Sequence, residues 1–200
     1  GTVMAHDVFG DPLEDGSSTF LKFSDSCGTK ASVMVKPFGK DRPKSPPTSG
    51  LAKVTYPNGD IYEGNFEGNL RHGKGIMKYF NGRQYRGKWR LDLPHGAGEE
   101  VQADRTTYKG EYHQGAWQGH GVETNVYGDE YNGGWKAGQR HGKGDFFSDG
   151  LHYEGDWHTG RRHGTGKCVF RNGDVYEGDF EADFMHGQGN MMLANGSRYM

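Results

Sequence analysis

A tyrosine-glycine pattern recurs along this chain every 23 residues, with one step of 22, and this period constrains the fold more than any other feature. Each copy begins with Tyr-x-Gly and has an aromatic residue two positions after the glycine. It reaches His-Gly-x-Gly ten positions after the tyrosine, although the third copy has Gln118 in place of the histidine. A fixed period indicates a repeat architecture in which each unit contacts its neighbours. The tyrosines that begin the six complete copies are Tyr62, Tyr85, Tyr108, Tyr131, Tyr153 and Tyr176, and Tyr199 begins a seventh.

Each copy is expected to form a β-hairpin. Turn pairs such as Asn58-Gly59 precede most of the tyrosines and tolerate the positive φ of a tight turn. Residues i, i+2 and i+4 of a strand share one face, so the tyrosine, the glycine and the second aromatic residue lie together. Stretches such as 67–72 are expected to be polar linkers between hairpins. The pattern predicts an all-β fold, an elongated single-layer antiparallel sheet of tandem 23-residue hairpins, twisted into a groove.

Composition excludes several classes of protein. Glycine supplies 35 of the 200 residues, which is incompatible with a helical fold because interior glycine destabilises helices. The formal net charge of -2 gives no reason to expect nucleic acid. The two cysteines, Cys27 and Cys168, lie too far apart in sequence for a metal motif and suit a reducing, cytoplasmic location. The first residues lack the pattern of a secretory leader, and no apolar run is long enough for a membrane helix.

Three segments follow from the distribution of residues. The repeats occupy residues 51–200, a Pro/Gly-rich linker occupies 39–50, and residues 1–38 form an N-terminal arm or capping segment. Within the last of these, Thr19–Phe23 and Ala31–Val35 alternate apolar and polar residues and can pair as a hairpin that caps the first repeat. The alternatives are an arm along the aromatic face and a disordered tail. The linker also has the polyproline-type spacing Lys40-x-x-Pro43-x-x-Pro46.

The repeated unit resembles the MORN repeat (membrane occupation and recognition nexus). The first copy, Tyr-Glu-Gly-Asn-Phe followed by His-Gly-Lys-Gly and Asn-Gly, shows the resemblance, which covers about residues 54–200. Copy three departs most, with Gln118 for histidine and Trp117 where other copies carry arginine. The resemblance implies a scaffold that binds partner proteins, self-associates or lies near membranes. It also implies attachment to cytoskeletal structures such as cilia.

These observations favour a non-enzymatic scaffold that binds a partner protein or peptide. A single-layer sheet cannot bury both of its faces in itself, and rigid aromatic side chains are effective anchors for a bound segment. No cofactor is expected, and no catalytic set of residues recurs. The predicted partner-binding groove consists of Tyr62, Phe66, Tyr85, Trp89, Tyr108, Tyr112, Trp117, Tyr131, Trp135, Tyr153, Trp157, Tyr176 and Phe180.

Other functions stay open at this stage. A membrane-surface module would need a basic patch facing anionic lipid. The sheet can also form a homodimer through its C-terminal edge, or serve as a regulatory part of a larger enzyme. No metal site is expected, because equivalent histidines of adjacent repeats stand about 10 Å apart, too far to share one ion. The predicted lipid-facing rim consists of Arg71, Lys74, Arg140, Lys143, Arg161, Arg162 and Lys167.

Overall fold

The computed structural model describes residues 19–24, 30–35 and 46–200, which divide into two units, 1–45 and 46–200. In the first unit, β1 (Thr19–Ser24) pairs with β2 (Lys30–Val35) in an antiparallel hairpin. These are the two segments whose alternation predicted such a hairpin. Its roles as a cap or as an arm stay predictions. Residues 1–18, 25–29 and 36–45, which include Lys40 and Pro43 of the polyproline-type stretch, lie outside the described residues.

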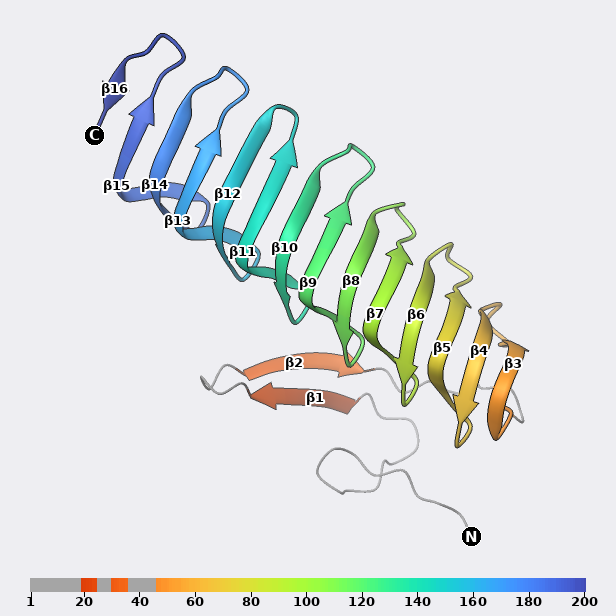
Figure 1. Ribbon diagram of the computed structural model, residues 1–200. Coiled ribbons are helices and arrows are strands. Elements are labelled where there is room, and N and C mark those ends of the chain that lie inside the picture. The colour runs from red at the N-terminus through yellow and green to blue at the C-terminus, as the bar shows by residue number, and fades with distance from the viewer. Residues whose placement is uncertain (1–18, 25–29, 36–45) are drawn as a thin grey trace. The chain divides into compact units, whose positions relative to one another are not determined.

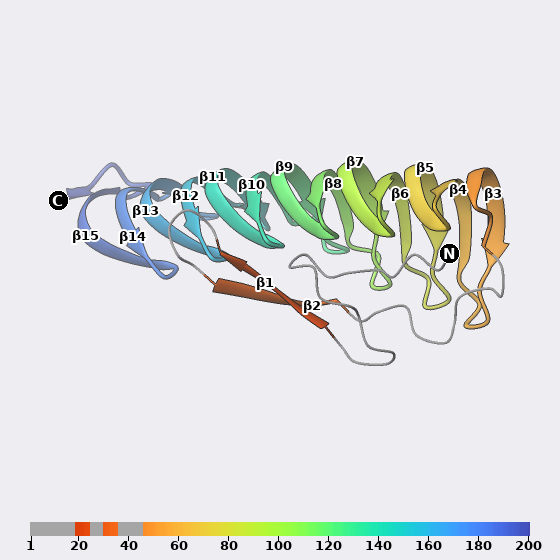
Figure 2. The same ribbon diagram turned by 90° about the horizontal axis from the view of Figure 1, so that it is seen from below.

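The second unit is one open sheet of 14 strands in which every strand pairs with the next strand in sequence (Figure 1). All the pairs are antiparallel, as the repeat pattern predicts. Figure 2 shows that the strands are bent and lie side by side in a single layer. The strands are β3 (Ser49–Thr55), β4 (Ile61–Glu67), β5 (Leu70–Lys78), β6 (Gln84–Arg90), β7 (Leu93–Val101), β8 (Thr107–His113), β9 (Ala116–Thr124), β10 (Glu130–Lys136), β11 (Gln139–Ser148), β12 (Leu151–His158), β13 (Arg161–Val169), β14 (Val175–Glu181), β15 (Phe184–Met192) and β16 (Arg198–Tyr199).

Each repeat contributes two strands, so repeats one to six correspond to β4–β5 through β14–β15. The turns predicted from Asn-Gly connect one repeat to the next, and their glycines have positive φ, as at Gly59 (87°). The turns inside the repeats are shorter than expected. In repeat one only Gly68 and Asn69 lie between the strands, because β4 extends to Glu67 and β5 starts at Leu70. The stretch 67–72 is therefore mostly strand and not a linker.

The core of the sheet is a continuous ladder of aromatic rings on one face. The first tyrosine of each repeat contacts the second aromatic ring of its own repeat and that of the following repeat, as Tyr62 contacts Phe66 and Trp89. Ring centroids along the ladder are 5.0–5.4 Å apart and the rings meet edge to face. Such pairs contribute about 0.5–1.5 kcal/mol each beyond the burial of area. The ladder therefore joins every repeat to its neighbour.

Glycines form a bed under each tyrosine. Gly110 and Gly121 face each other on β8 and β9, and Tyr108 lies over them. A Cβ atom at Gly121 would lie 2.5 Å from Cε2 of Tyr108. The Tyr108 hydroxyl donates a hydrogen bond to the backbone oxygen of Glu111 at 3.0 Å, and the other five tyrosines make the equivalent bond at 2.9–3.0 Å. Glycine is thus required here because the ring lies flat on the backbone.

Candidate partner-binding site

The two faces of the sheet carry different side chains. We call the face with the tyrosine ladder, which includes Tyr62 and Phe66, the ring face. We call the opposite face the histidine face, because His95, His113 and His141 lie on it by the alternation of the strands. A partner-binding site on either face needs accessible side chains, so exposure decides which predicted residues a partner can reach.

Most of the predicted groove residues are buried by one another. The six first tyrosines are 0–7% exposed and the six second aromatics 2–5% exposed. Only Trp117 among the thirteen is half-buried. The twelve buried rings form the core of this single-layer sheet and leave little surface to contact another molecule. Direct contact of these twelve rings with a partner stays a prediction, whereas Trp117 has accessible surface in the structure.

Burial also sets the chemistry of the tyrosines. Loss of hydration raises the pKa of Tyr131 to about 12, although the nearby Arg140 opposes this effect. Burial raises the pKa of Tyr112 as well, and the carboxylate of Glu100 adds to the increase. These hydroxyls therefore stay protonated at neutral pH and act as hydrogen-bond donors.

A second row of side chains lies over the ladder at one position per repeat. In repeats one, four and five this position is arginine. Arg71 lies 4.3 Å from the ring centre of Trp89, Arg140 4.8 Å from that of Tyr131, and Arg162 5.5 Å from that of Phe180. These are cation–π distances. Repeats two and three instead have Pro94 and Trp117 at this position, so neither supplies an arginine to this row. Trp89 of repeat two is covered by Arg71 of repeat one.

The same two repeats carry carboxylates where the others carry apolar groups. The residue paired with the first tyrosine is Met77 in repeat one and Phe146 in repeat four, but Glu100 in repeat two and Glu123 in repeat three. A buried carboxylate needs partners. Oε1 of Glu100 accepts a hydrogen bond from Nε of Arg83 at 2.7 Å.

The other oxygen of Glu100 is also bonded. Oε2 accepts a hydrogen bond from the Tyr112 hydroxyl at 2.9 Å, and Nε1 of Trp117 lies 3.5 Å away. Burial lowers the pKa of Arg83, but the hydrogen bond to Glu100 and the electrostatic interactions with Tyr79, Glu100 and Tyr112 together outweigh this effect, so the pKa of Arg83 is raised. Glu123 is 22% exposed, and its Oε2 accepts both bonds from Arg140, at 2.9 and 3.3 Å.

A cavity of about 490 Å³ opens on the ring face beside these residues. Trp117, Ala103 and Ala116 supply apolar wall, while Glu100 and Glu123 supply carboxylates. The volume is in the range of sites that hold small molecules or single side chains of a partner. The remaining lining residues are Asn81, Arg83, Gln102, Gly115 and Gly138.

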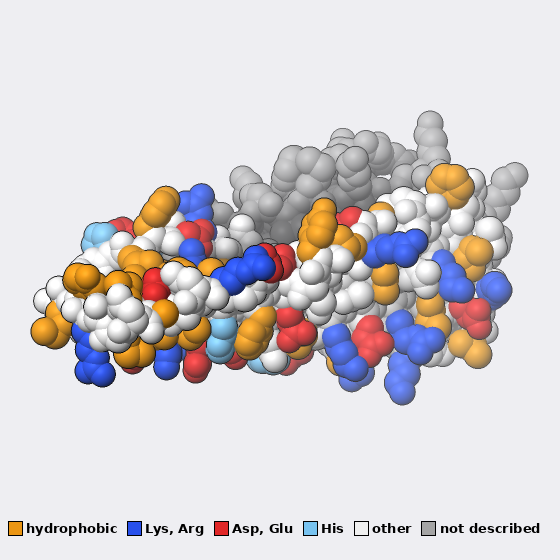
Figure 3. All heavy atoms as spheres, turned by 90° about the horizontal axis from the view of Figure 1, so that it is seen from above, with side chains coloured by type: hydrophobic (Ala, Val, Ile, Leu, Met, Phe, Trp, Pro, Cys, Tyr) orange, Lys and Arg blue, Asp and Glu red, His pale blue; other side chains and the backbone are white. Residues whose placement is uncertain are grey.

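The structure does not bring the predicted lipid-facing rim together on one face. Arg71, Arg140 and Arg162 lie on the ring face, and Arg71 is only 1% exposed. By contrast, Lys74, Lys143, Arg161 and Lys167 alternate onto the histidine face. The sequence grouped them because they are neighbours in the chain, but neighbouring residues of a strand point to opposite faces. At the end of the sheet with the Asn-Gly turns, basic side chains are mixed with acidic and hydrophobic ones (Figure 3).

Two histidines outside the His-Gly-x-Gly position, His113 and His158, lie close to histidines at that position. His95 and His113 have ring centres 5.3 Å apart, and His158 lies 5.2 Å from His141 and 5.5 Å from His163. Burial lowers the pKa of His95, and the charges of His113 and Arg90 act in the same direction. In the part of the chain that the structure describes, no group of three or more side chains could hold a metal ion. That part also contains no candidate membrane-spanning helix.

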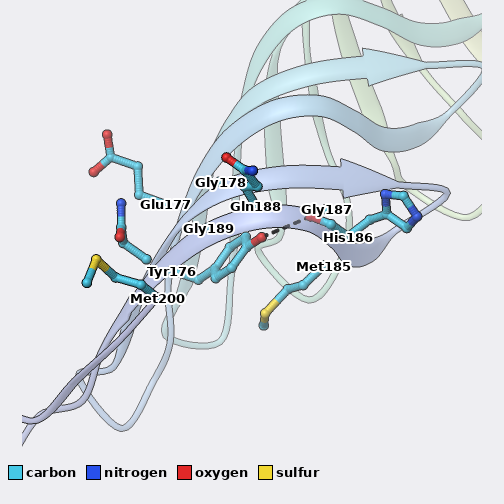
Figure 4. Close-up of a pocket in the computed structure, with 10 residues that line it drawn as sticks. Tyr176, Glu177, Gly178, Met185, His186, Gly187, Gln188, Gly189 and Met200 are labelled. Carbon is cyan, nitrogen blue, oxygen red and sulfur yellow. Dashed lines mark hydrogen bonds between the residues drawn. The ribbon is translucent and has the colours of Figure 1, made fainter.

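A second cavity, of about 910 Å³, lies at the C-terminal edge of the sheet. Figure 4 shows Tyr176, Met185 and Met200 around it. In the described chain β16 pairs with β15 only at Met191 and Met192, so the edge of β15 from Gly187 to Asn190 faces this cavity.

Comparison with protein families identifies the class of this chain. A model described as MORN repeat matches residues 62–82, 85–107, 108–126, 131–152, 153–175 and 176–198. The chain therefore belongs to the MORN repeat family, and the resemblance stated from its sequence is confirmed. Comparison with curated proteins gave no match.

Two solved structures resemble the chain only distantly. The TCP domain of Drosophila melanogaster SAS-4 (dCPAP), solved with a proline-rich motif of Ana2 (dSTIL), has 14% identity and a TM-score of 0.45 over 94% of each chain. The wild-type TCP10 domain of Danio rerio CPAP, solved with a peptide of Danio rerio STIL, has 13% identity and a TM-score of 0.30. That match covers 91% of this chain and 98% of the other. At these values neither structure establishes a shared function.

Sequence reasoning found the rings but missed the cavity. One signal was available, since Trp117 is an exception in the repeat pattern. The exchange of an apolar residue for Glu100 and Glu123 was a second signal, visible when the six copies are aligned. What the sequence could not show is that both exceptions meet at one cavity.

Proposed function

We propose that this protein is a non-enzymatic scaffold that holds an extended segment of a partner protein against the ring face, over repeats two to four. The cavity beside Trp117 is the observation that carries the proposal. Repeats one, four and five supply arginines that cover rings of the ladder, whereas repeats two and three supply an indole and two carboxylates that line an open cavity.

The character of the cavity supports a binding role. Its apolar wall provides area that a partner side chain can cover, and the surrounding polar groups fix orientation through hydrogen bonds. The pairing of Arg83 with Glu100 and of Arg140 with Glu123 holds the two carboxylates in place before a partner arrives. Preorganised groups of this kind reduce the entropy lost on binding.

Site-specific photo-crosslinking tests which face binds. A benzoylphenylalanine replaces Ala103, which is exposed and lines the cavity, and in a second variant Ala97, which is exposed on the histidine face of β7. Both variants are irradiated in extract from the source cells, and the adducts are identified by mass spectrometry. We expect partner adducts from position 103 and background only from position 97.

A matched variant shows whether the adducts depend on the cavity. Trp117→Arg restores the arginine of repeats one, four and five and should reduce the adducts from position 103. Adducts of equal yield from both faces, or adducts from position 97 alone, would contradict the ring-face model.

A separate proposal concerns self-association. The C-terminal edge presents unpaired strand at Gly187–Asn190, a template to which another strand can add. Sedimentation velocity at increasing concentrations should then detect a dimer. Asn190→Lys, at an exposed position of the same edge, should weaken the dimer because a charged side chain on an edge strand opposes the addition of another strand. A monomer at every concentration rules out this dimer.

A further inference from the structure

We infer that the cavity beside Trp117 accepts a lysine or arginine side chain of the bound segment, with its cation over the indole and next to Glu123. This inference rests on the proposed function and specifies the chemistry of its partner. The evidence is threefold: the arginines that the chain places on its own rings, the geometry of Trp117, and the oxygen of Glu123 that Arg140 does not use.

The repeats show which group this face accepts. Where a repeat has arginine in the row over the ladder, the guanidinium lies on the rings, as Arg71 does on Trp89 at 4.3 Å and Arg140 on Trp157 at 5.3 Å. Repeats two and three lack that arginine, and they are also the repeats in which carboxylates replace apolar residues. Pro94 and Trp117 thus take the place of an internal cation there, and the cavity beside them is lined by Glu100 and Glu123 together with Arg83, which is paired with Glu100.

The outer face of the indole is accessible. Trp117 stacks on Tyr108 with ring centres 4.1 Å apart and planes at 4°. Trp135 is 4.9 Å from Trp117 and 5.4 Å from Tyr108, and it is perpendicular to both. If Trp135 lay on the outer face of Trp117, the indole would separate it from Tyr108. The ring centres of Trp135 and Tyr108 would then be much farther apart than 5.4 Å. Trp135 therefore lies beside the stacked pair, which leaves the outer indole face to the cavity that Trp117 lines.

Glu123 supplies the charge. Both hydrogen bonds from Arg140 go to Oε2, so Arg140 does not use Oε1. The guanidinium of Arg140 lies over Tyr131, Phe146 and Trp157 of repeats four and five, and this residue is not among those that line the cavity. Glu100 differs from Glu123, since both of its oxygens are occupied and it is only 5% exposed. An aromatic face and an available carboxylate oxygen that line the same cavity are the chemistry that recognises a side-chain cation.

Short peptides test this preference directly. The probes are acetyl-Gly-Ser-Lys-Ser-Gly-amide and the same peptide with norleucine or glutamate in place of lysine, titrated into the whole chain. The indole N–H resonance of Trp117, assigned with Trp117→Phe, reports binding. We expect the lysine peptide to bind roughly fivefold more tightly than the norleucine peptide, with the glutamate peptide weakest.

Matched variants separate a specific effect from a structural one. Glu123→Gln should remove the preference for lysine, whereas Glu99→Gln, on the histidine face of β7, should leave it intact. Trp117→Arg should abolish lysine binding, because the chain's own guanidinium then occupies the position.

Each outcome has a defined meaning. Equal affinity for the three peptides at Trp117, or tighter binding of glutamate, overturns the cation preference and leaves peptide binding on the ring face standing. If no peptide perturbs Trp117 while crosslinking from position 103 yields partner adducts, the anchor is wrong and the proposed function survives. If only position 97 yields crosslinked adducts, both the cation preference and partner binding on the ring face are wrong.

Discussion

Repeats two and three differ from repeats one, four and five in how their ring face is covered. In the second group an arginine of the chain lies on the ladder, and Arg71 and Arg162 also bond to aspartates of the next repeat, Asp92 and Asp183. In the first group Pro94 and Trp117 take that position, and Glu100 and Glu123 face the cavity. The ladder beneath is the same in both groups, so the difference concerns the side chains that cover the ring face and not the fold of the repeats.

Under the proposed function, this contrast separates the positions that stabilise the sheet from those that bind a partner. Positions in the ladder contact both neighbouring repeats, so any repeat that lost one would weaken two interfaces. Positions above the ladder differ between repeats, as Arg71, Pro94 and Trp117 show at one equivalent position. The cavity lies where two adjacent repeats differ from the others at these positions.

The largest expected effect is the loss of stability when a Cβ is added under a tyrosine of the ladder. It should be of the same size in repeat three and repeat four, because both groups of repeats share the ladder. Gly121→Ala in repeat three and Gly144→Ala in repeat four each place a Cβ 2.5 Å from an atom of the tyrosine above it. Backbone and ring cannot both move aside, so each change should lower the free energy of unfolding by about 3 kcal/mol or more. Urea unfolding followed by tryptophan fluorescence measures this.

The control for these variants is Gly138→Ala, at a turn with φ of 78° and open space around it. It should cost only the about 1–2 kcal/mol of a left-handed backbone. If Gly121→Ala lowered the free energy of unfolding no more than this control, glycine would not be required under the tyrosine ring.

An intermediate effect is expected at the polar cluster of repeat two. Glu100→Met introduces the residue that repeat one has at the same position, but leaves Arg83 half-buried without its carboxylate. We expect a loss of about 2 kcal/mol, since the Tyr112 hydroxyl also loses its acceptor. Thermal unfolding of this single variant provides the measurement.

The double variant with Arg83→Thr, the residue at the corresponding position of repeat three, should regain at least half of that loss. An ion pair replaced as a whole is often nearly neutral. If the double variant were as unstable as the single one, the acidic residues would be needed for folding and not for recognition.

The smallest effect is expected for Trp117→Arg, which converts repeat three toward the pattern of repeats one, four and five. It removes the stack on Tyr108 and supplies a cation to the same rings, and these terms are of similar size. The free energy of unfolding should change by no more than about 1 kcal/mol, as measured by urea denaturation. Trp117→Ala, which removes the stack without replacement, is the control and should lose about 2 kcal/mol.

Much of the fold could be predicted from the residues. The period of 23, the turn glycines and the Tyr-x-Gly alternation predicted the strands and their antiparallel order, because each of these signals is local. The short turns inside the repeats were not predicted. They place Leu91, Ala137 and Thr159 at φ of 49–50°, and these residue types are not typical of a left-handed turn. The grouping of Arg71 with Lys74 failed because a sequence neighbourhood does not identify a face.

The sequence by itself determined a ribbon of paired strands with aromatic rings on one face, because strand alternation and glycine spacing are properties of the local chain. Only the tertiary structure decided which rings remain accessible. Edge-to-face packing between repeats buries twelve of the thirteen predicted groove rings, and the cavity is lined by Trp117 and Glu123 of β9 together with residues of other strands, such as Glu100 of β7. Burial depends on the neighbours that the fold supplies, which a residue pattern does not contain.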